Sequence, residues 1–403
     1  MTKLSKFGEA FLLLALRIDK HIKGYIDFYY GPERLRQIVE CEALTAPHTL
    51  LNDSNDLLKQ LGSQGFDKER IQYIEKLLIA MKTSIDILIG STISVKAQIS
   101  RLYDVELQPV NESKLYDLKE ELYNAYGRSG NLEERLKDIR IRRKVVESDV
   151  FNFFKKALQI VKNRTNELLT NFLPKNETII IDLAKRNKEN EIKWSYYNWY
   201  LGNYTSRIKV NPSFNIYWSS LLSAAAHEGY PGHHTEFAIK EHRLFHELFQ
   251  FEHSILFLNS PKLIISEGIA NLAINVLYSY RDQAEISVRE FCRKKTNEDS
   301  LDIITNQFRV RRKLDLFLYD LTYHALIDEW SNEKLFNYAN SFEIFSKENI
   351  NNRIKFLTNP VHATTAFSYT IGSNLIIDKY GEFPSMDNFY NLLTKPVLPS
   401  DLI

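Results

Sequence analysis

The stretch from His227 to His234 contains the residues of this chain that are best suited to metal chemistry. It reads His-Glu-Gly-Tyr-Pro-Gly-His-His, so three of the 10 histidines lie in it beside Glu228. Catalytic zinc sites take three protein ligands from histidine, aspartate, glutamate or cysteine and leave one position for water. In the pattern His-Glu-x-x-His, both histidines lie on one face of a helix and the glutamate lies beside the water. His227 and Glu228 begin this pattern, but Pro231 occupies the place of the second histidine.

The spacing after Glu228 determines which imidazole can bind the same metal ion as His227. On a regular helix a six-residue step turns roughly 240° away, and a seven-residue step lies about 10 Å further along the axis. Pro231 removes one intrahelical hydrogen bond and its glycine neighbours tolerate unusual dihedral angles, so the helix can bulge there. The smaller bulge brings back His233, which we predict as the second ligand ahead of His234. The remaining imidazole is expected to face the substrate or to support the site.

A third ligand is expected from another helix, and Glu267 is the best candidate. It follows the apolar run Leu263-Ile264-Ile265 and begins a segment rich in small residues. A carboxylate in such a place is rarely buried unless it is paired or bound to a metal. We therefore predict a single Zn²⁺ ion held by His227, His233 and Glu267, although imidazole and carboxylate also suit other divalent ions.

The chemistry expected of such a site is hydrolysis. A bound metal can lower the pKa of its water from about 15.7 to near 7. Glu228 would take the proton from that water and pass it to the leaving group. The developing oxyanion needs a second donor, for which we predict Tyr369, with His324 or His234 as alternatives.

Two other interpretations of the histidines are open. His242 and His246 have a true four-residue spacing, but no acid directly follows His242 and charged residues flank the pair. This pattern is also typical of a solvated helix face. The histidines between His227 and His234 could also be unrelated surface or core residues.

The elements that must position these residues are mostly helical. Helical patterns cover residues 7–30, after which Gly31-Pro32 begins another helix, and residues 71–88, which Asp67 can cap. Asn131 to Glu134 reads as a capping box that opens one long helix ending at Pro174. The first part of the chain, residues 1–174, is therefore predicted to be a helical lobe.

The pattern changes after Pro174. Residues 178–181 are β-branched, residues 193–200 are aromatic, and residues 206–211 alternate apolar with polar side chains. We predict a small antiparallel sheet there, followed by helices, so that residues 175–403 form the catalytic lobe. The boundary is soft, and one continuous domain is the alternative. Residues 206–211 could pair with a peptide substrate at a sheet edge, or form an ordinary edge protected by Arg207 and Lys209.

Net charge, cysteine content and the length of apolar runs indicate the binding partners and the compartment expected of this protein. A net charge of +1 gives no electrostatic argument for binding nucleic acid or membranes. Cys41 and Cys292 are the two cysteines and lie far apart, which favours a reducing compartment over a disulfide framework. The apolar run Phe11–Leu16 is too short for a signal peptide or a membrane span. We expect a cytoplasmic protein, and the sequence does not indicate its oligomeric state.

The residues from Ala226 to His234 resemble the motif His-Glu-x-x-Pro-Gly-His-His of the bacterial domain of unknown function 885, a group of gluzincin-like zinc peptidases. Further blocks are similar to features of that family: Ser266-Glu267-Gly268, Ala366 to Gly372, Tyr29-Tyr30-Gly31-Pro32, Tyr323-His324 and Arg353. The chain departs from the family at Ile269 and Asn271, where an aromatic residue is frequent, and it is shorter than many members. The resemblance implies a mostly helical, zincin-like metallopeptidase fold acting on peptides.

We thus expect a mainly α metallopeptidase body with a small antiparallel sheet. The expected function is zinc-dependent cleavage of peptide bonds. The alternatives are a noncatalytic zinc-binding or partner-binding scaffold of the same fold, and a metal-dependent hydrolase of another amide or an ester.

Overall fold

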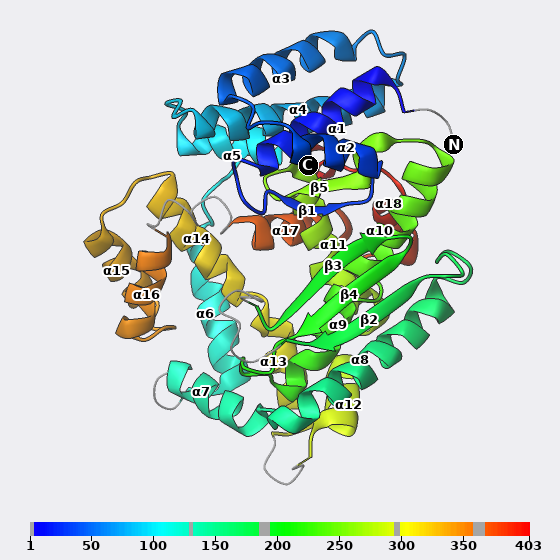
Figure 1. Ribbon diagram of the computed structural model, residues 1–403. Helices are drawn as coiled ribbons and strands as arrows, with labels where there is room; N and C mark the ends of the chain where they lie inside the picture. The colour runs from blue at the N-terminus through cyan, green and yellow to red at the C-terminus, as the bar shows by residue number, and fades with distance from the viewer. Residues whose placement is uncertain (1–3, 129–131, 185–193, 294–298, 358–366) are drawn as a thin grey trace.

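The computed structural model describes residues 4–128, 132–184, 194–293, 299–357 and 367–403 (Figure 1). Helices make up most of this part of the chain, with one two-stranded and one three-stranded sheet. The predicted fold class, a mainly α protein with a small sheet beside the motif helix, is confirmed.

The N-terminal elements share apolar cores to which later parts of the chain also contribute. They are α1 (Lys6–Asp19), β1 (Ile26–Tyr29), α2 (Glu33–Cys41), α3 (Pro47–Leu61), α4 (Lys68–Leu88) and α5 (Val95–Tyr103). The predicted cap of α4 is confirmed, because the side chain of Asp67 accepts a hydrogen bond from the backbone N–H of Arg70 at 2.8 Å. The apolar stripe of α4 is buried, including Ile74, Leu77 and Met81.

The prediction of one helix over residues 7–30 is wrong in its second half. The helix α1 ends at Asp19, whose carboxylate accepts a hydrogen bond from the N–H of Ile26 at 3.0 Å. Gly24 has a positive φ of 79° and turns the chain into β1. This strand pairs antiparallel with β5 (Ile255–Phe257), so a distant partner overrides the local helical pattern.

The prediction of one long helix from residue 131 to residue 174 is also wrong. The chain forms α6 (Glu112–Tyr126), α7 (Leu132–Arg143) and α8 (Glu147–Leu168). The helical pattern breaks because Lys144 forms a β-bridge with Tyr217 and the N–H of Val145 donates to the carbonyl of Ile216 at 2.8 Å. Asn131, the predicted capping residue, lies outside the described residues.

The three-stranded sheet contains β2 (Thr178–Leu183), β3 (Tyr196–Gly202) and β4 (Thr205–Val210) in the order β2-β4-β3. The pair β3–β4 is antiparallel, as predicted, whereas β2 joins β4 in parallel. Because β4 has a partner on both sides, the proposal that residues 206–211 offer a free edge to a peptide is wrong. The open edges belong to β2 and β3.

The remaining helices include α11, which lies in the middle of the molecule (Figure 1) and packs against several of them. They are η1 (Trp218–Ser220), α9 (Leu221–Glu228), α10 (His233–Lys240), η2 (Glu241–Glu247, π-helical), η3 (Phe251–Ser254), α11 (Pro261–Leu277), α12 (Tyr280–Phe291), α13 (Leu301–Arg311), α14 (Leu314–Leu326), α15 (Asn332–Ser341), α16 (Lys347–Leu357), α17 (Ser368–Tyr380), α18 (Met386–Thr394) and η6 (Pro399–Leu402). Most side chains of α11 are buried, so its position is fixed on nearly all sides.

A glycine contact sets the distance between α11 and α17. A Cβ added to Gly372 would lie 1.8 Å from the carbonyl oxygen of Ile264, and one added to Gly268 would lie 2.6 Å from the carbonyl carbon of Gly372. The two helix backbones therefore approach more closely than side chains would allow. The contact lies directly beside Glu267.

Apolar clusters hold these elements together across Pro174. One contains Phe154 and Val161 of α8 together with Ile265 and Leu272 of α11. Another contains buried apolar residues between Phe7 and Ile85 together with Phe251, Ile255, Phe257 and Leu398. Side chains from both parts of the chain therefore support the helices around the motif.

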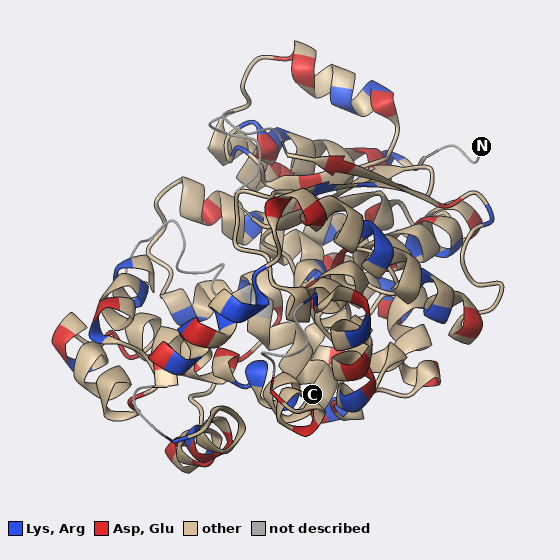
Figure 2. Cartoon of the chain, turned by 90° about the horizontal axis from the view of Figure 1, so that it is seen from below, with Lys and Arg blue, Asp and Glu red and all other residues tan. Residues whose placement is uncertain are grey.

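In the view of Figure 2, lysine and arginine are interspersed with aspartate and glutamate along the described elements. Among the described residues, no single helix has the length and apolar composition needed to cross a bilayer. The pair α11 and α12 meets these criteria only when joined, and it is bent by 81°.

Candidate metal centre

The motif forms two helices joined by a tight turn rather than one bulged helix. The helix α9 ends at Glu228, residues 229–232 form the turn, and α10 starts at His233. The N–H of Gly232 donates to the carbonyl of Ala226 at 2.9 Å, so the turn folds back over the end of α9. A Cβ on Gly232 would lie 2.1 Å from the carbonyl oxygen of His227. Glycine is thus required where the backbones cross, and this crossing brings His233 back to His227.

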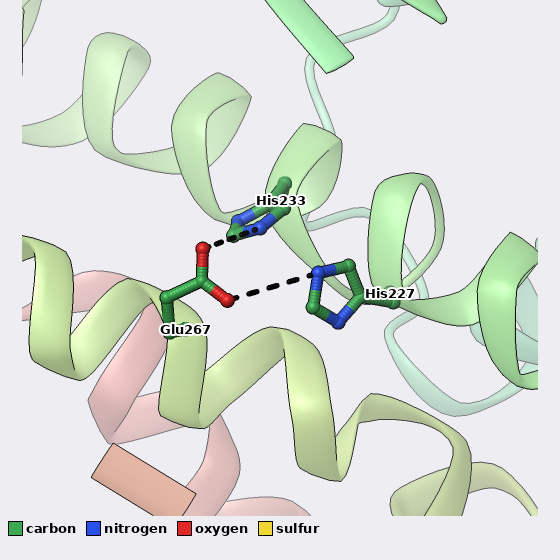
Figure 3. Close-up of side chains that lie close together, drawn as sticks. All are labelled: His227, His233 and Glu267. Carbon is green, nitrogen blue, oxygen red and sulfur yellow. Dashed lines mark ion pairs between the residues drawn. The ribbon is translucent and has the colours of Figure 1, made fainter. Parts of the chain in front are cut away.

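Three predicted ligands converge at this point (Figure 3). One nitrogen or oxygen of each of His227, His233 and Glu267 lies within 4.8 Å of the others. His233 Nε2 lies 3.6 Å from Glu267 Oε1, and His227 Nε2 lies 3.9 Å from Glu267 Oε2. The two imidazole rings meet edge to face with their centroids 4.7 Å apart. The structure therefore brings the predicted ligand set together.

The donor set fits a divalent cation. The Oε2 atom of Glu267 is buried and has no hydrogen-bond partner among the described residues. A buried carboxylate oxygen without a donor is costly. Two imidazoles and one carboxylate are also the ligands that a catalytic zinc ion takes.

A buried hydrogen-bond chain orients His233. Its Nδ1 lies 3.2 Å from Ser266 Oγ, and this hydroxyl donates to Glu236 Oε2 at 2.6 Å. The same glutamate receives a hydrogen bond from Lys240 Nζ at 2.6 Å. Because the hydroxyl proton points to Glu236, Ser266 accepts from Nδ1–H, and in the neutral form of the ring this hydrogen-bond network assigns the lone pair to Nε2. The nitrogen that faces Glu267 is thus the one able to bind a metal.

Sequence reasoning gave no role to Ser266, Glu236 or Asn271. Glu236 lies three residues after His233, a spacing that places both on one helix face. Asn271 lies four residues after Glu267 and hydrogen-bonds the side chain of His227. Helical spacing from the predicted ligands was therefore the signal that could have found two of these supporting residues.

Burial and mutual charge set the electrostatics of the three ligands in the metal-free protein. Burial, followed by the charge of His233, lowers the pKa of His227 to about 4. Burial would also lower the pKa of His233, but the hydrogen bond and charge of Glu267 outweigh it and raise the pKa to about 9. Burial acts to raise the pKa of Glu267, yet His233 and His227 bring it below its ordinary value. The carboxylate is consequently ionised at neutral pH.

Glu228 ends α9 beside the ligands and is half-buried. Its backbone carbonyl accepts a hydrogen bond from Asn198 Nδ2 of β3 at 2.6 Å. Burial raises the pKa of its carboxyl group to about 7, with further raising by the charges of Glu267 and Asp27 and opposition from His233. The strand β3 thus fixes the residue predicted to act as general base.

Asp27 of β1 is an unpredicted acid in this neighbourhood. It accepts a hydrogen bond from the phenol of Tyr197. Burial raises the pKa of Asp27, and the charges of His233 and Glu267 also act on it. Asp27 belongs to a segment predicted as helix, so its approach to the centre could not be foreseen.

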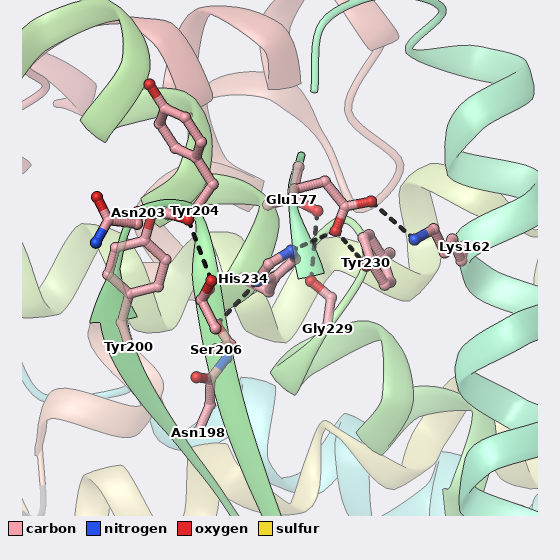
Figure 4. Close-up of polar contacts among 12 residues, drawn as sticks. Lys162, Glu177, Asn198, Tyr200, Asn203, Tyr204, Ser206, Gly229, Tyr230 and His234 are labelled. Atoms are coloured by element: carbon pink, nitrogen blue, oxygen red, sulfur yellow. Dashed lines mark hydrogen bonds and ion pairs between the residues drawn. The ribbon is translucent and has the colours of Figure 1, made fainter. Parts of the chain in front are cut away.

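The structure does not place His234 in the metal cluster (Figure 4). Its ring is fully buried, with Nδ1 2.9 Å from Ser206 Oγ and Nε2 2.8 Å from Glu177 Oε2. Lys162 Nζ also contacts Glu177, at 2.8 Å. Both ring nitrogens are therefore engaged by the sheet and the segment before it. The expectation that His234 faces the substrate is wrong, and its contacts hold the start of α10 in place.

The two other predicted catalytic residues lie on later helices. His324 of α14 directs Nδ1 to Asp328 at 2.7 Å and Nε2 to Asp320 at 3.4 Å, and its ring stacks on Trp330. It therefore belongs to a different cluster from the three ligands. The backbone of Tyr369 lies in α17, but its side chain is outside the described part of the structure, as is Ala366. The role of Tyr369 stays a prediction.

The alternative histidine pair has other partners. His242 Nε2 lies 3.3 Å from Glu247, and His246 Nε2 lies 3.3 Å from Glu241. Both imidazoles are more than two-fifths exposed. Within the described residues, His227, His233 and Glu267 form the one group with metal-binding geometry.

Comparison with known proteins gives no family assignment. No family model and no curated protein matches the sequence. Two solved structures, each 12% identical, are titled "putative lipoprotein". The alignment with that of Colwellia psychrerythraea covers 88% of this chain with a TM-score of 0.49, and this chain spans 65% of that protein's chain. The alignment with that of Shewanella oneidensis, described as of unknown function, covers 96% of this chain and 80% of that chain with a TM-score of 0.45.

Proposed function

We propose that this protein is a zinc-dependent hydrolase that cleaves peptide bonds, with one ion held by His227, His233 and Glu267. The observation that carries the proposal is the buried, unpartnered Oε2 of Glu267, which faces one imidazole while Oε1 faces the other. Glu228, which directly follows His227, adds the predicted general base to the three candidate ligands. The resemblance of residues 226–234 to the zinc-peptidase motif supports the same class of activity.

The residues of this chain have separate tasks in that reaction. When bound, zinc supplies a Lewis acid that polarises a carbonyl and lowers the pKa of water. Glu228 accepts the proton of the attacking water and delivers it to the leaving amine. Ser266 and Asn271 orient the two imidazoles, and the contact of α11 with α17 fixes Glu267.

The first test combines metal analysis with the substitution Glu228→Gln. We expect one zinc per chain in both proteins, and a fall in peptide hydrolysis of about 10²–10⁴-fold in the variant. Glu247→Gln is the matched control, because Glu247 is exposed and contacts His242 rather than the centre. Hydrolysis by a mixed peptide pool is followed by mass spectrometry.

The outcomes separate the alternatives. Absence of bound divalent metal after zinc loading would contradict every zinc-dependent function. Stoichiometric zinc without hydrolysis of peptides, amides or esters would identify a noncatalytic zinc-binding scaffold. Activity that survives Glu228→Gln would assign the proton transfer to another group.

A further inference from the structure

A cavity of about 290 Å³ opens beside the candidate centre. His227 and Asn271 line it, as do Arg311 and Arg312 from the junction of α13 and α14. Ser287 of α12 also contributes to its wall. The cavity therefore adjoins the predicted ligands of the metal and contains groups that the reaction described above does not use.

Two buried hydrogen-bond donors on this cavity lack partners. Arg312 Nη1 and Ser287 Oγ are both buried, and neither has a hydrogen-bond partner among the described residues. Ser287 lies in α12 and Arg312 lies between α13 and α14, so the fold brings two distant segments to one cavity. Leaving such groups unpaired costs free energy, and a ligand with acceptor oxygens would remove that cost.

Burial and neighbouring charges act in opposite directions on the guanidinium of Arg312. Burial lowers its pKa, and the charges of Tyr280, Asp315 and Glu382 oppose that effect only in part. A buried guanidinium is favourable when a carboxylate pairs with its planar fork. An anionic ligand would supply that partner.

The neighbouring cavity, of about 370 Å³, has the same polarity. It shares Ser219, Arg311 and Asp315 with the first cavity. Four arginines and two carboxylates line it, including Arg140 and Arg353. Basic groups thus predominate on the side of the centre that faces α13, which favours an anionic end of a substrate.

We propose that the smaller cavity binds the free C-terminal carboxylate of the peptide substrate through Arg312 and Ser287, so that the protein acts as a carboxypeptidase. This inference rests on the proposed peptidase function, because it names the substrate of the same centre. Arg312 and Ser287 are binding residues for the end of the chain, whereas Glu228 serves the bond to be cleaved.

The size and position of the cavity agree with this assignment. Its volume lies just below the roughly 300–1,000 Å³ common for ligand pockets, which suits one terminal residue better than an extended peptide. With that residue in place, the last peptide bond lies on the His227 side. Hydrolysis breaks its C–N bond, water adds a hydroxyl to the acyl carbon, and a proton goes to the amine of the released residue.

The test compares two pools of short acetylated peptides of random sequence, one with free C-terminal carboxylates and one with C-terminal amides. We expect wild-type protein to remove single residues from the acid pool with a kcat/KM about 10²-fold higher than for the amide pool. Arg312→Gln should remove most of this preference by lowering kcat/KM for the acid pool alone. Ser287→Ala should reduce it in the same direction by a smaller factor.

Controls distinguish binding from folding. Arg101→Gln removes the same charge from an exposed position and should leave the preference unchanged. Because Arg312 Nη1 has no partner, Arg312→Gln should not lower the melting temperature. A lower melting temperature together with an unchanged acid preference would show that Arg312 is structural, and equal cleavage of both pools by wild type would also overturn the proposal.

A second measurement separates this inference from the peptidase proposal. Metal-free protein, which cannot carry out the proposed metal-dependent hydrolysis, is titrated with each pool. Its melting temperature is measured at each concentration. We expect a larger stabilisation by the acid pool, absent in Arg312→Gln. If hydrolysis is absent but this difference is present, the carboxylate site stands and the peptidase function fails. If hydrolysis occurs but both pools act alike, the carboxylate site fails and the peptidase function stands.

Discussion

At the scale of single residues, the orientation of His233 depends on an uncharged neighbour. Ser266 lies between the imidazole and Glu236, and Lys240 neutralises that glutamate. Groups that hydrogen-bond the far nitrogen of a ligating histidine fix its tautomer and raise its basicity. We therefore expect Ser266 to affect the affinity for a bound metal without touching that metal.

We predict that Ser266→Ala weakens zinc binding by about 10–100-fold. The cause is the loss of the acceptor for Nδ1–H of His233, which leaves the ring free to rotate or change tautomer. Zinc affinity is measured by competition with a chromophoric chelator. Ser84→Ala is the matched control, since Ser84 is equally buried but donates to Ala80 in another core; equal affinities in the two variants would contradict the prediction.

The sequence indicates the cluster of His227, His233 and Glu267 because the histidines are unusually concentrated beside Glu228 and Glu267 follows an apolar run. The choice of His233 over His234 was made from the size of a bulge, whereas the chain uses a complete turn. The role of His234 could not be predicted, because Ser206 and Glu177, its partners, are distant in sequence. Residue types thus indicate the kind of site, whereas tertiary contacts decide which of two neighbouring histidines belongs to it.

At the scale of elements, the turn between α9 and α10 determines whether the two imidazoles meet. Its backbone crosses the last turn of α9 at Gly232, where there is no room for a side chain. The sequence indicated an irregularity through Pro231 and its glycine neighbours. It could not indicate that the helix ends and a new helix begins.

We predict that Gly232→Ala lowers the free energy of unfolding by about 1–3 kcal/mol or more and abolishes tight zinc binding. The added Cβ would lie 2.1 Å from the carbonyl oxygen of His227 and 2.4 Å from that of Ala226, so the turn must move. Urea unfolding and zinc titration give the two quantities. Gly62→Ala should change neither, because Gly62 has a φ of −63° and open space around its Cβ position.

Helices were predicted well where their own periodicity and caps decide them, as in α4. Helices were predicted poorly where a segment far away in the sequence forms hydrogen bonds with the backbone groups that the helix would otherwise use. Val145 interrupts the long helix because Ile216 offers it a carbonyl, and residues 26–29 become β1 because β5 offers an edge. Such competition depends on contacts between residues far apart in the chain, which local patterns do not report.

At the scale of the whole molecule, charged side chains connect parts of the chain that are distant in sequence. Arg70 of α4 forms a bidentate pair with the buried carboxylate of Glu252, at 2.7 and 2.8 Å. Glu177, before β2, contacts Lys162 of α8 and His234 of α10. These pairs are buried or nearly so, and their loss is therefore more costly than that of surface pairs.

We predict that Glu177 gives the protein an acid-sensitive stability. Burial alone would raise its pKa, but hydrogen bonds from His234, Lys162 and Tyr230 bring it to about 2, below the ordinary value of 4.5. The unfolded chain therefore binds a proton more readily than the folded one. The resulting stabilisation, on the order of 2 kcal/mol, is complete above pH 4.5 and is lost as the pH falls towards 2.

Urea unfolding between pH 7 and pH 3 provides the measurement. Glu177→Gln should be less stable than wild type at pH 7, and the difference should shrink as the pH falls below 4.5. Glu40→Gln, at an exposed position, is the control and should follow the wild-type curve. A difference that stays constant over this range would show that the contribution of Glu177 is not electrostatic.

The position of the centre along the chain bears on the order of folding. The elements α9, α10 and α11 follow one another closely, with the ligands on all three, whereas Asp27 and Arg312 reach the centre from much earlier and later in the chain. Nearby segments meet at a lower entropic cost than distant ones. We therefore expect zinc, bound as proposed, to gather its ligands in a nascent chain before β1 and α13 arrive, and so to act as a template on which the walls of the site close.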